Sequence, residues 1–547
     1  MSAALERLRA EGLGALDLEL AELLARLCPA AEHAAALALG AALASFWRRQ
    51  RHACLPLAEV AGAALERAAD PRWGERAPAL AEWCAALLAS GLVARHGEEE
   101  ARLPLVLDVA DRLYLQRMDH AESQVAAHLT ALLEPLAPPP GLPSLLAERA
   151  AALDPEQREA LRAAFSRRLA VLTGGPGTGK TSVLGLLLEL AGCLEPDLRI
   201  ALAAPTGRAA ARMQEAVGGT HPTRTLHRLL LERPPLDWLV VDEASMVDLP
   251  LMARALELLP EDGRLLLIGD ADQLASVEAG AVLAGIRDGL SALPAPEDAT
   301  PALIRLRRSR RFPEGSGIGA LAAAAREGDA EGTLELLAGG AADLAWIRPR
   351  QPDAGEALAR TLEEGWRPFL EAAGGPAALG ALESFRVLCA ARRGRLGVEG
   401  INGWCRRRWA GPDGGREPLL VRANDPALGL ANGDSGVREP GADGARCWLA
   451  AGGAPRALAP SQLPAHDAAW AITVHQSQGA EMDEVLLILP EAPSPLLCRE
   501  LLYTGVTRAR RRLTVVAGEE ALRLAVTQRL ERSGGLADRL RERLTSV

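Results

Sequence analysis

The segment GGPGTGKT, residues 174–181, has the spacing G-x-x-x-x-G-K-[ST] and follows an apolar run at residues 169–173. Glycines let successive backbone N–H groups curl around phosphate oxygens, and the helix expected after the segment adds positive potential from its N-terminus. A glycine-rich turn that binds nothing is the alternative, but the strand–loop–helix context favours nucleotide binding. We predict an ATP site formed by Gly174, Gly175, Pro176, Gly177, Thr178, Gly179, Lys180, Thr181 and Ser182.

Lys180 is the only lysine in a chain with 61 lysine and arginine residues in total. The arginine excess is typical of a GC-rich coding background. A compact ammonium suits the β- and γ-phosphates inside a narrow loop, where the broader guanidinium of arginine is a poor substitute. A chain that otherwise uses arginine keeps lysine where that exchange fails, and we therefore assign Lys180 a catalytic role.

Acidic and amide side chains follow two further apolar runs. Asp242 and Glu243 come directly after WLVV, and Asp270 and Gln273 lie in GDADQL. An aspartate at such a position suits the binding of Mg²⁺ together with the Thr181 hydroxyl, and the adjacent glutamate suits orienting or deprotonating the attacking water. We expect the Gln273 carboxamide to sense the γ-phosphate. The alternative for the acidic pair is a structural cap on the next helix.

Gln157 lies in LDPEQREAL, shortly before the phosphate-binding segment. Its amide has the donor and acceptor needed to read the edge of adenine. An isolated glutamine is a surface residue by default, so this prediction depends on the neighbouring segment.

The elements that must position these residues follow an α/β pattern. RRLAVLTGG, LRIALAAPTG, LDWLVVDEAS and GRLLLIGDAD each end in a polar or glycine-rich turn, which predicts strands with a ligand site at their carboxyl ends. A second α/β unit begins near residue 300, with strands expected at FRVLCA, EVLLILP and RRLTVVAG. Within it, a Gly/Pro/Asp-rich stretch predicts a small β insertion.

The first 100 residues show apolar positions at helical spacing, and PLVLDVADRLYLQRM (104–118) predicts a pair of strands. The proline-rich APPPGLP (137–143) predicts a stiff linker. The expected organisation is a helical N-terminal domain at 1–136, a linker at 137–144, a first α/β domain at 145–298, a second at 299–410 and 466–547, and a β insertion at 411–465.

The composition is ordinary for a globular chain, with 49% hydrophobic and 24% charged residues and a net charge of −10. That charge argues against a protein that coats nucleic acid indiscriminately, but not against a local basic groove. The eight scattered cysteines, without a C-x-x-C pair, predict reduced thiols rather than a disulfide framework or zinc site. The sequence shows no signal-peptide layout and no membrane-spanning apolar run, so we expect a cytoplasmic protein without a membrane partner.

Many further motifs occur in a fixed order. Together they resemble the superfamily-one DNA helicases, and closely the RecD family, whose members are the alpha subunit of the RecBCD (exonuclease V) complex. The resemblance covers roughly residues 105–535. It is carried by GGPGTGKT, APTGRAA (204–210), TLHRLL (225–230), VVDEASMVDLP (240–250), GDADQLASVEAGAVL (269–283), RRSRRF (307–312), SGIGALA, LGVEGIN (396–402), ANGDSG (431–436), TVHQSQGAEMDEV (473–485) and ELLYTGVTRARRRL (500–513).

The resemblance implies an α/β fold with two RecA-like P-loop domains, a helical N-terminal domain and a small SH3-like β insertion in the second RecA-like domain. ATP and Mg²⁺ would lie in the cleft between the RecA-like domains. Arg311 and Arg508 match the helicase arginines that reach the γ-phosphate from the second domain as arginine fingers. Each arginine taken alone would be a solvated surface charge, because RRSRR and RARRR are charge runs.

The resemblance also implies that single-stranded DNA crosses both RecA-like domains. Hydroxyls, backbone amides and arginines at the matching motifs suit phosphates, which give affinity without sequence information. Trp404 and Trp409 flank basic residues, but a half-buried helix explains them better than base stacking. The alternative for the two histidines is a structural role. The candidate DNA contacts are Pro205, Thr206, Gly207, Arg208, His227, Thr473, His475 and Ser477.

The function implied is an ATP-driven translocase that unwinds duplex DNA in the 5′-to-3′ direction in double-strand-break repair and recombination. RecB-like and RecC-like subunits would be its partners, with the N-terminal domain as the docking site. Nucleases of the RecB type need an acidic cluster and a lysine, and the only lysine lies in the P-loop, so we expect no nuclease site in this chain.

Two alternatives stay open. A stand-alone RecD-like helicase would carry a longer N-terminal region with helix-hairpin-helix repeats, and none is visible before residue 145. A nucleotide-switched structural subunit need not keep Glu243, Arg311 and Arg508 together.

The sequence also departs from the family where Gln476 replaces the usual lysine and where residues 231–238 form a shortened segment; residues 1–100 match only in being helical and variable.

Overall fold

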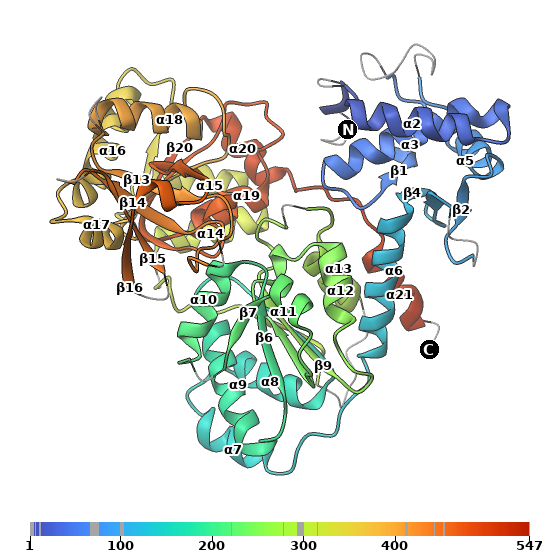
Figure 1. The fold of residues 1–547 in the computed structure, drawn as a ribbon, viewed down its shortest axis with the longest axis horizontal. Coiled ribbons are helices and arrows are strands. Elements are labelled where there is room, and N and C mark those ends of the chain that lie inside the picture. The colour runs from blue at the N-terminus through green and yellow to red at the C-terminus, as the bar shows by residue number, and fades with distance from the viewer. Residues whose placement is uncertain are drawn as a thin grey trace.

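The computed structural model describes residues 5, 7–9, 12–65, 76–98, 103–219, 221–276, 278–292, 300–313, 315–410, 414–425, 427–441, 444–451 and 454–545. An N-terminal domain and two α/β domains are separate in Figure 1, and the helices α6 and α21 run side by side along the first α/β domain. None of the helices in these ranges is long and apolar enough to cross a membrane.

The first α/β domain is built on a six-stranded sheet in the order β10-β5-β9-β8-β6-β7, in which every pairing is parallel. Leu169 and Val171 pack against one layer of helices, and Ala170 and Leu172 against the other. Because both faces are covered, strands β5, β8 and β9 are largely continuous apolar runs in the sequence, whereas the edge strand β7 is polar. The strands are β5 (Leu169–Gly174), β6 (Ile200–Ala204), β7 (Thr223–Thr225), β8 (Trp238–Val241), β9 (Arg264–Gly269) and β10 (Leu303–Leu306).

The helices of this domain cover both faces of the sheet. One layer holds α7 (Leu142–Arg149), α8 (Pro155–Ser166), α9 (Lys180–Leu194) and α10 (Gly207–Ala216). The other holds α6 (Gln116–Ala131), α11 (Leu226–Glu232), α12 (Leu249–Leu256), α13 (Val282–Ser291) and α21 (Leu536–Thr545).

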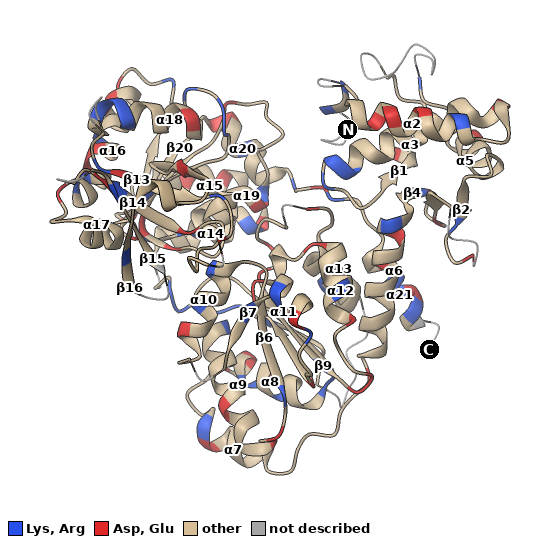
Figure 2. Ribbon diagram, viewed as in Figure 1, with Lys and Arg blue, Asp and Glu red and all other residues tan. Residues whose placement is uncertain are grey.

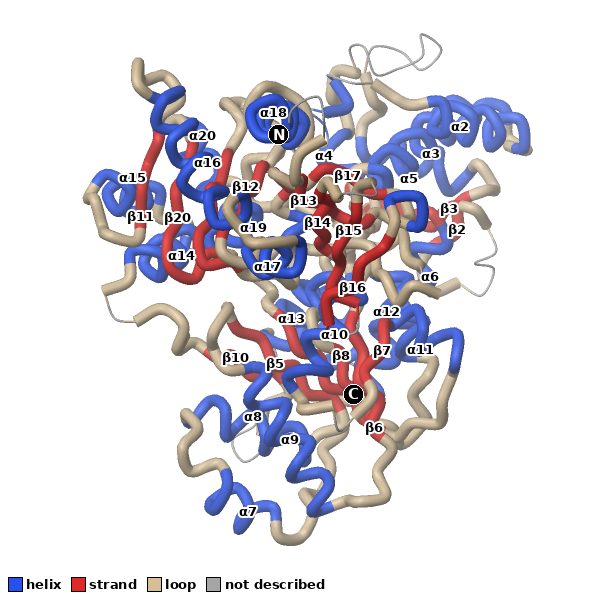
Figure 3. Tube along the Cα trace, turned by 60° about the vertical axis from the view of Figure 1, so that its left-hand side comes forward, coloured by secondary structure: helices blue, strands red, loops and turns tan. Residues whose placement is uncertain are grey.

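The second α/β domain has a five-stranded parallel sheet in the order β11-β20-β19-β12-β18, seen beside the first sheet in Figure 3. Its strands are β11 (Leu344–Ile347), β12 (Phe385–Cys389), β18 (Ala471–Thr473), β19 (Met482–Ile488) and β20 (Ala509–Val516). One face carries α14 (Gly317–Glu327), α15 (Ala330–Ala338), α19 (Arg499–Val506) and α20 (Glu519–Thr527), and the other α16 (Ala354–Leu370), α17 (Gly375–Ala381) and α18 (Val398–Cys405).

The predicted β insertion is an antiparallel sheet in the order β16-β15-β14-β13-β17. Its strands are β13 (Glu417–Val421), β14 (Ser435–Glu439), β15 (Arg446–Ala451), β16 (Ala454–Leu458) and β17 (His466–Ala468). The insertion therefore extends three residues beyond the predicted end at 465, because β17 pairs with β13. Its SH3-like character stays a prediction.

The N-terminal domain contains α2 (Ala15–Leu27), α3 (Ala34–Arg49), α4 (Leu57–Val60) and α5 (Leu80–Ala89) around a four-stranded sheet. The strands are β1 (Leu55–Pro56), β2 (Val93–Arg95), β3 (Leu105–Leu107) and β4 (Arg112–Leu115). The predicted pair at 104–118 is confirmed as the antiparallel β3 and β4, although its last residues begin α6. The prediction missed β1 and β2, which are too short to show a period.

Three predicted domain boundaries need correction. The division between 298 and 299 lies outside the described residues, but β10 pairs with β5 and so belongs to the first domain. The C-terminal helix α21 was assigned to the second domain, yet it packs on α6 and α13. Helix α6, predicted in the N-terminal domain, contributes Val125 and Leu129 to the core of the first domain. Each assignment failed because chain order does not reveal which sheet a terminal element joins.

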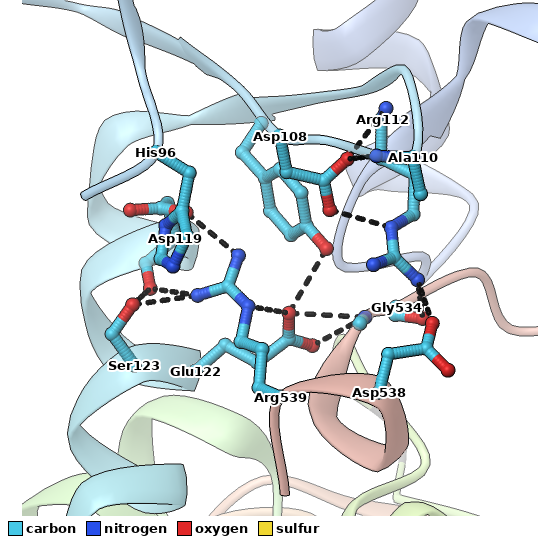
Figure 4. A network of polar contacts seen from close by, with 12 residues as sticks. His96, Asp108, Ala110, Arg112, Asp119, Glu122, Ser123, Gly534, Asp538 and Arg539 are labelled. Carbon is cyan, nitrogen blue, oxygen red and sulfur yellow. Dashed lines mark hydrogen bonds and ion pairs between the residues drawn. The ribbon is translucent and has the colours of Figure 1, made fainter. Parts of the chain in front are cut away.

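A buried polar network fixes the C-terminal segment on α6 and β4 (Figure 4). The Glu122 carboxylate accepts hydrogen bonds from the Tyr114 hydroxyl and the Gly535 N–H, both at 3.0 Å. The Arg539 guanidinium lies 3.3 Å from Glu122 and donates to Asp119 at 2.7 Å. A buried carboxylate is costly unless it is paired, so this network holds the segment to the N-terminal side of the molecule.

Candidate functional site

The phosphate-binding loop connects β5 to α9 at the carboxyl edge of the first sheet. Gly177 and Gly179 adopt positive φ angles of 72° and 87°. A Cβ at Gly177 would lie 2.3 Å from the Arg311 Cβ, and one at Gly179 would lie 2.3 Å from Gln157 Nε2, so both positions require glycine. The structure therefore forms the predicted loop.

The Lys180 ammonium points back into this loop. It donates to the carbonyl oxygen of Gly175 at 2.9 Å and also to that of Gly174. A cation held over the inner face of the loop is in place to bind phosphate oxygens.

Gln157 is 2% exposed and packs on the loop, contrary to a surface role. Its Nε2 donates to the Thr178 carbonyl at 2.9 Å, and its Oε1 accepts from the Asp154 N–H at 3.1 Å. Asp154 is the N-cap of α8, so the start of this helix is tied to the phosphate loop. Reading of adenine by this amide stays a prediction.

Asp242 and Glu243 lie at the carboxyl end of β8. Burial, followed by the neighbouring Glu243 carboxylate, raises the pKa of Asp242 to about 6. The Asp242 carboxylate accepts the Glu243 N–H at 2.8 Å, and Glu243 has a left-handed φ of 51°. Non-glycine residues in this region are strained and concentrate at functional sites. A raised carboxylate pKa also indicates that a cation would stabilise the ionised form.

At the end of β9, Asp270 joins the two α/β domains. Its Oδ2 accepts hydrogen bonds from Gln273 Nε2 and from the Tyr503 hydroxyl of α19, each at 3.1 Å. A Cβ at Gly175 would lie 2.8 Å from that hydroxyl, which places Tyr503 over the phosphate loop. Sequence reasoning did not single out Tyr503, although it lies in the quoted motif ELLYTGVTRARRRL.

Arg311 follows β10 and lies directly against the loop rather than on the body of the second domain, where it was predicted. The Arg310 N–H donates to the Gly177 carbonyl at 2.8 Å, which fixes this segment. The Arg311 guanidinium donates to Glu481 at 2.6 Å. Glu481, in the quoted motif TVHQSQGAEMDEV, was also missed as a site residue.

Arg508, by contrast, is buried in the second domain. Its Nε donates to the Thr504 carbonyl at 3.2 Å and its Nη1 to the Ala480 carbonyl at 3.1 Å. Burial lowers its pKa, against the opposing effect of the Glu243 and Glu481 carboxylates. Arg508 thus faces the same cleft as Glu243 while holding two backbone segments together.

A cavity of about 1290 Å³ lies between the domains, and four predicted DNA contacts line it: Thr206, Arg208, Thr473 and His475. Gln476, the expected departure from the resembled family, also lines it, and its Oε1 accepts the Thr473 N–H at 2.9 Å, so it caps a turn.

The remaining predicted DNA contacts lie elsewhere. Pro205 does not line the cavity, and His227 is exposed on α11 outside it. A Cβ at Gly207 would lie 2.4 Å from the Ala431 Cβ, so Gly207 packs on the insertion. The buried Ser477 hydroxyl donates to the Val474 carbonyl at 2.7 Å and stabilises the turn instead of facing the cavity.

Trp404 and Trp409 pack edge to face at 5.5 Å, and Trp409 also contacts Trp470. They belong to the core of the second domain, as the half-buried interpretation predicted.

Comparisons with known proteins agree with this geometry. Family models match residues 152–342 as an AAA domain, 468–516 as a UvrD-like helicase C-terminal domain and 9–114 as the N-terminal domain of RecBCD enzyme subunit RecD. RecBCD enzyme subunit RecD of Mycobacterium tuberculosis is 40% identical over 96% of this chain and 95% of its own length. The subunit RecD of Haemophilus influenzae is 32% identical over 71% of this chain and 72% of its own.

One further relative and one solved structure also match the chain. The ATP-dependent RecD2 DNA helicase of Deinococcus radiodurans is 32% identical over 79% of this chain but only 59% of its own length. A Bacteroides Pif1 crystal structure with single-stranded DNA superposes with a TM-score of 0.42 at 17% identity, over 68% of this chain and 93% of its own.

Two parallel sheets with a P-loop at the edge of the first, together with the family models and the 40% identical RecD subunit, define a superfamily-one DNA helicase with an ATP-binding site. Within that class, the chain belongs to the RecD family.

Proposed function

We propose that the chain translocates on single-stranded DNA and unwinds duplex DNA in the 5′-to-3′ direction, as the RecD subunit of a RecBCD-type helicase and nuclease acting in the cytoplasm. Two features of the structure together support this proposal. Residues from both α/β domains meet at the phosphate loop, and residues from the same two domains line the large cavity.

The hydrolysis step would use the groups at the cleft as follows. Lys180 and the loop amides bind the β- and γ-phosphates, and Glu243 orients or deprotonates the attacking water. Arg311, released from Glu481, and Arg508 stabilise the charge that develops on the transferred phosphoryl group.

The donor set fits Mg²⁺. The Thr181 hydroxyl and the Asp242 carboxylate are hard oxygen ligands of the kind that this ion takes. A bound Mg²⁺ would neutralise charge on the β- and γ-phosphates. Thr181 and Asp242 are the residues that would hold it.

A short connection joins the cleft to the cavity. Gln273 lies in the cleft, and its neighbour Leu274 lines the cavity. The Leu274 N–H donates to Thr504 Oγ1 at 2.9 Å, and its carbonyl accepts from Gln478 Nε2 at 2.7 Å. Closure of the cleft around ATP would therefore displace two segments of the second domain that reach the cavity, which supports coupling of hydrolysis to strand movement.

The direction of unwinding is the sharpest test of the proposal. We expect the full-length chain, with ATP and Mg²⁺, to unwind a duplex with a 5′ single-stranded tail and to leave the matching 3′-tailed duplex paired. Strand separation can be followed by the release of a fluorescent strand, with ADP in place of ATP as the control. Unwinding of the 3′-tailed duplex alone would overturn the direction, and ATP hydrolysis without unwinding of either substrate would favour the nucleotide-switched alternative.

The partner proposal is supported by exposed apolar side chains. Among the described residues, four of the five exposed large hydrophobics belong to the N-terminal domain, namely Leu16, Leu23, Leu27 and Val109. The three leucines occur at helical spacing on α2 and form one stripe. Such a stripe is typical of a protein interface, and we assign it to a RecC-like subunit.

Charge placed on this stripe should release the partners. We expect a Leu16→Glu/Leu23→Glu variant to co-purify at least about tenfold less RecB-like and RecC-like protein from its native host, because interface cores depend on a few buried apolar anchors. Leu231→Glu is the matched control, since Leu231 is 83% exposed on α11 of the first domain. Equal recovery with both variants would exclude α2 as the dock, and no recovery with the wild-type chain would favour the stand-alone helicase.

A further inference from the structure

The large cavity has a wall that belongs to neither set of helicase motifs. The turn after α3, at residues 50–52, lines it from the N-terminal domain, and residues 527–532 line it from the C-terminal segment. Figure 1 shows the N-terminal domain beside the connecting segment that leads from α20 to α21. The first segment brings Arg51 to the cavity, and the second brings Arg532 and the exposed Arg529.

The turn that carries Arg51 is held at several points. Arg51 has a left-handed φ of 75°, and its carbonyl accepts the Gly280 N–H at 3.0 Å. His52 Nδ1 accepts the Ser533 N–H at 3.0 Å, and burial lowers the pKa of His52 to about 4. His52 is therefore a neutral imidazole that accepts at Nδ1 and carries its proton on Nε2. The Ala53 N–H donates to the Ser533 carbonyl at 2.8 Å. The backbone of Arg51 is thus fixed beside the cavity before any ligand arrives.

The cavity is strongly basic although the chain as a whole has a net charge of −10. Eight arginines line it, against one carboxylate, that of Glu531. Three of these arginines pair with carboxylates outside the cavity, because Arg49 pairs with Asp17, and Arg422 and Arg392 lie 3.5 Å and 4.0 Å from Asp467. The distribution of charged residues along the fold is shown in Figure 2. A local field of this sign attracts a polyanion regardless of the overall charge.

The charges of Arg51 and Arg532 act on each other and on His475 at this wall. Arg51 Nη1 lies 3.5 Å from His475 Nε2, and Arg532 donates to the carbonyls of Glu278 and Gly280. Burial, and then the charges of Arg51 and Arg532, lower the pKa of His475 to about 4. Burial and then Arg51 lower the pKa of Arg532 to about 10. Mutual repulsion of this kind is relieved when an anion enters between the groups.

We infer that the guanidinium of Arg51, with Arg532 beside it, binds the phosphodiester backbone of single-stranded DNA. The N-terminal domain and the C-terminal segment complete the DNA path that Thr206, Arg208 and Thr473 begin. The inference rests on the proposed function, because it takes the cavity as the route of the strand. The N-terminal domain, which carries the apolar stripe on α2, would then also bind DNA phosphates.

The test is the salt dependence of DNA binding. With the full-length chain, no nucleotide and a fluorescent oligothymidylate, we expect Arg51→Gln to bind several-fold more weakly than wild type. The plot of log affinity against log salt concentration should become shallower by about 0.7, the value for one phosphate contact with a single strand. Arg51→Lys should restore the slope, since it keeps the charge.

Arg48→Gln is the matched control, because Arg48 lies three residues away on α3 and pairs with Glu278 outside the cavity. It should keep the wild-type affinity and slope. A wild-type slope for Arg51→Gln, whether or not its affinity falls, overturns the inference. Arg208→Gln distinguishes failure of this inference from failure of the proposed function. If Arg208→Gln binds DNA more weakly and Arg51→Gln binds it as wild type does, only the inference fails. If both variants bind DNA as wild type does, the cavity is not the DNA path.

Discussion

The Lys180→Arg variant is expected to lose DNA-stimulated ATP hydrolysis by at least about 10²–10³-fold, the usual loss when one positioned charge is removed from a transition state. In the structure, the Lys180 ammonium fits between the carbonyls of Gly174 and Gly175 on the inner side of the loop. A guanidinium is planar and broader, so it cannot occupy that space and bind phosphate oxygens in the same way. Steady-state release of phosphate, with and without single-stranded DNA, measures the effect.

The fold should be unaffected by this exchange, because the hydrogen bonds that the structure shows for Lys180 go to backbone carbonyls of its own loop. Binding of single-stranded DNA without nucleotide should therefore stay at the wild-type level. Wild-type turnover in Lys180→Arg would show that the ammonium is not needed and would remove the catalytic role assigned to it.

The second large effect is expected at Arg311. We predict that Arg311→Gln lowers the turnover number for ATP by about 10³-fold or more, as is found for arginine fingers, with little change in ATP affinity. The Arg311 guanidinium is held at 2.6 Å by Glu481, while its backbone lies on the phosphate loop beside Gly177. It needs only to exchange the carboxylate for a phosphate oxygen. Single-turnover hydrolysis and equilibrium binding of a fluorescent ATP analogue separate the two quantities.

Arg307→Gln is the matched control for this variant. Arg307 lies in the same charge run, but its side chain is 83% exposed, and its guanidinium comes no nearer than 3.9 Å to the Glu156 carboxylate. It should hydrolyse ATP at the wild-type rate. Equal ATP turnover numbers in the two variants would show that Arg311 has no catalytic role.

Substitution of Arg508 would test the arginine-finger role less clearly than substitution of Arg311. Its guanidinium is buried and donates to the carbonyls of Thr504 and Ala480. Truncation would remove the Arg508 donor from the Ala480 carbonyl and would leave the Thr504 carbonyl with the Thr507 hydroxyl, which destabilises the second domain. A loss of activity there would mix misfolding with chemistry, whereas the partly exposed Arg311 separates them.

The sequence by itself determined the phosphate loop and most strands of the two parallel sheets, but it did not show β7, β10, β11 or β18. The groups at the phosphate loop are consecutive in the chain, so their geometry follows from local conformation, as Gly177 and Gly179 show with their positive φ angles. Buried strands such as β5 and β8 are continuous apolar runs because helices cover both faces of the sheet. Asp242 and Gln273 could be placed near the loop because carboxyl ends of neighbouring parallel strands share one edge.

Only the tertiary structure decided which distant residues complete the sites. Tyr503 over Gly175, Glu481 on Arg311 and Arg51 beside His475 are contacts between segments far apart in sequence. No periodicity or spacing encodes them, because each depends on how one domain docks on another.

The same reason explains the errors in the domain boundaries and in the DNA contacts. β10 and α21 join the first domain through pairing and packing with elements more than 100 residues away. Ser477 was predicted to face DNA from its motif alone, yet its hydroxyl is turned into the core to close a local hydrogen bond. Motif spacing identifies which residues are near a site, but the direction of each side chain depends on the burial and hydrogen bonds of the finished fold.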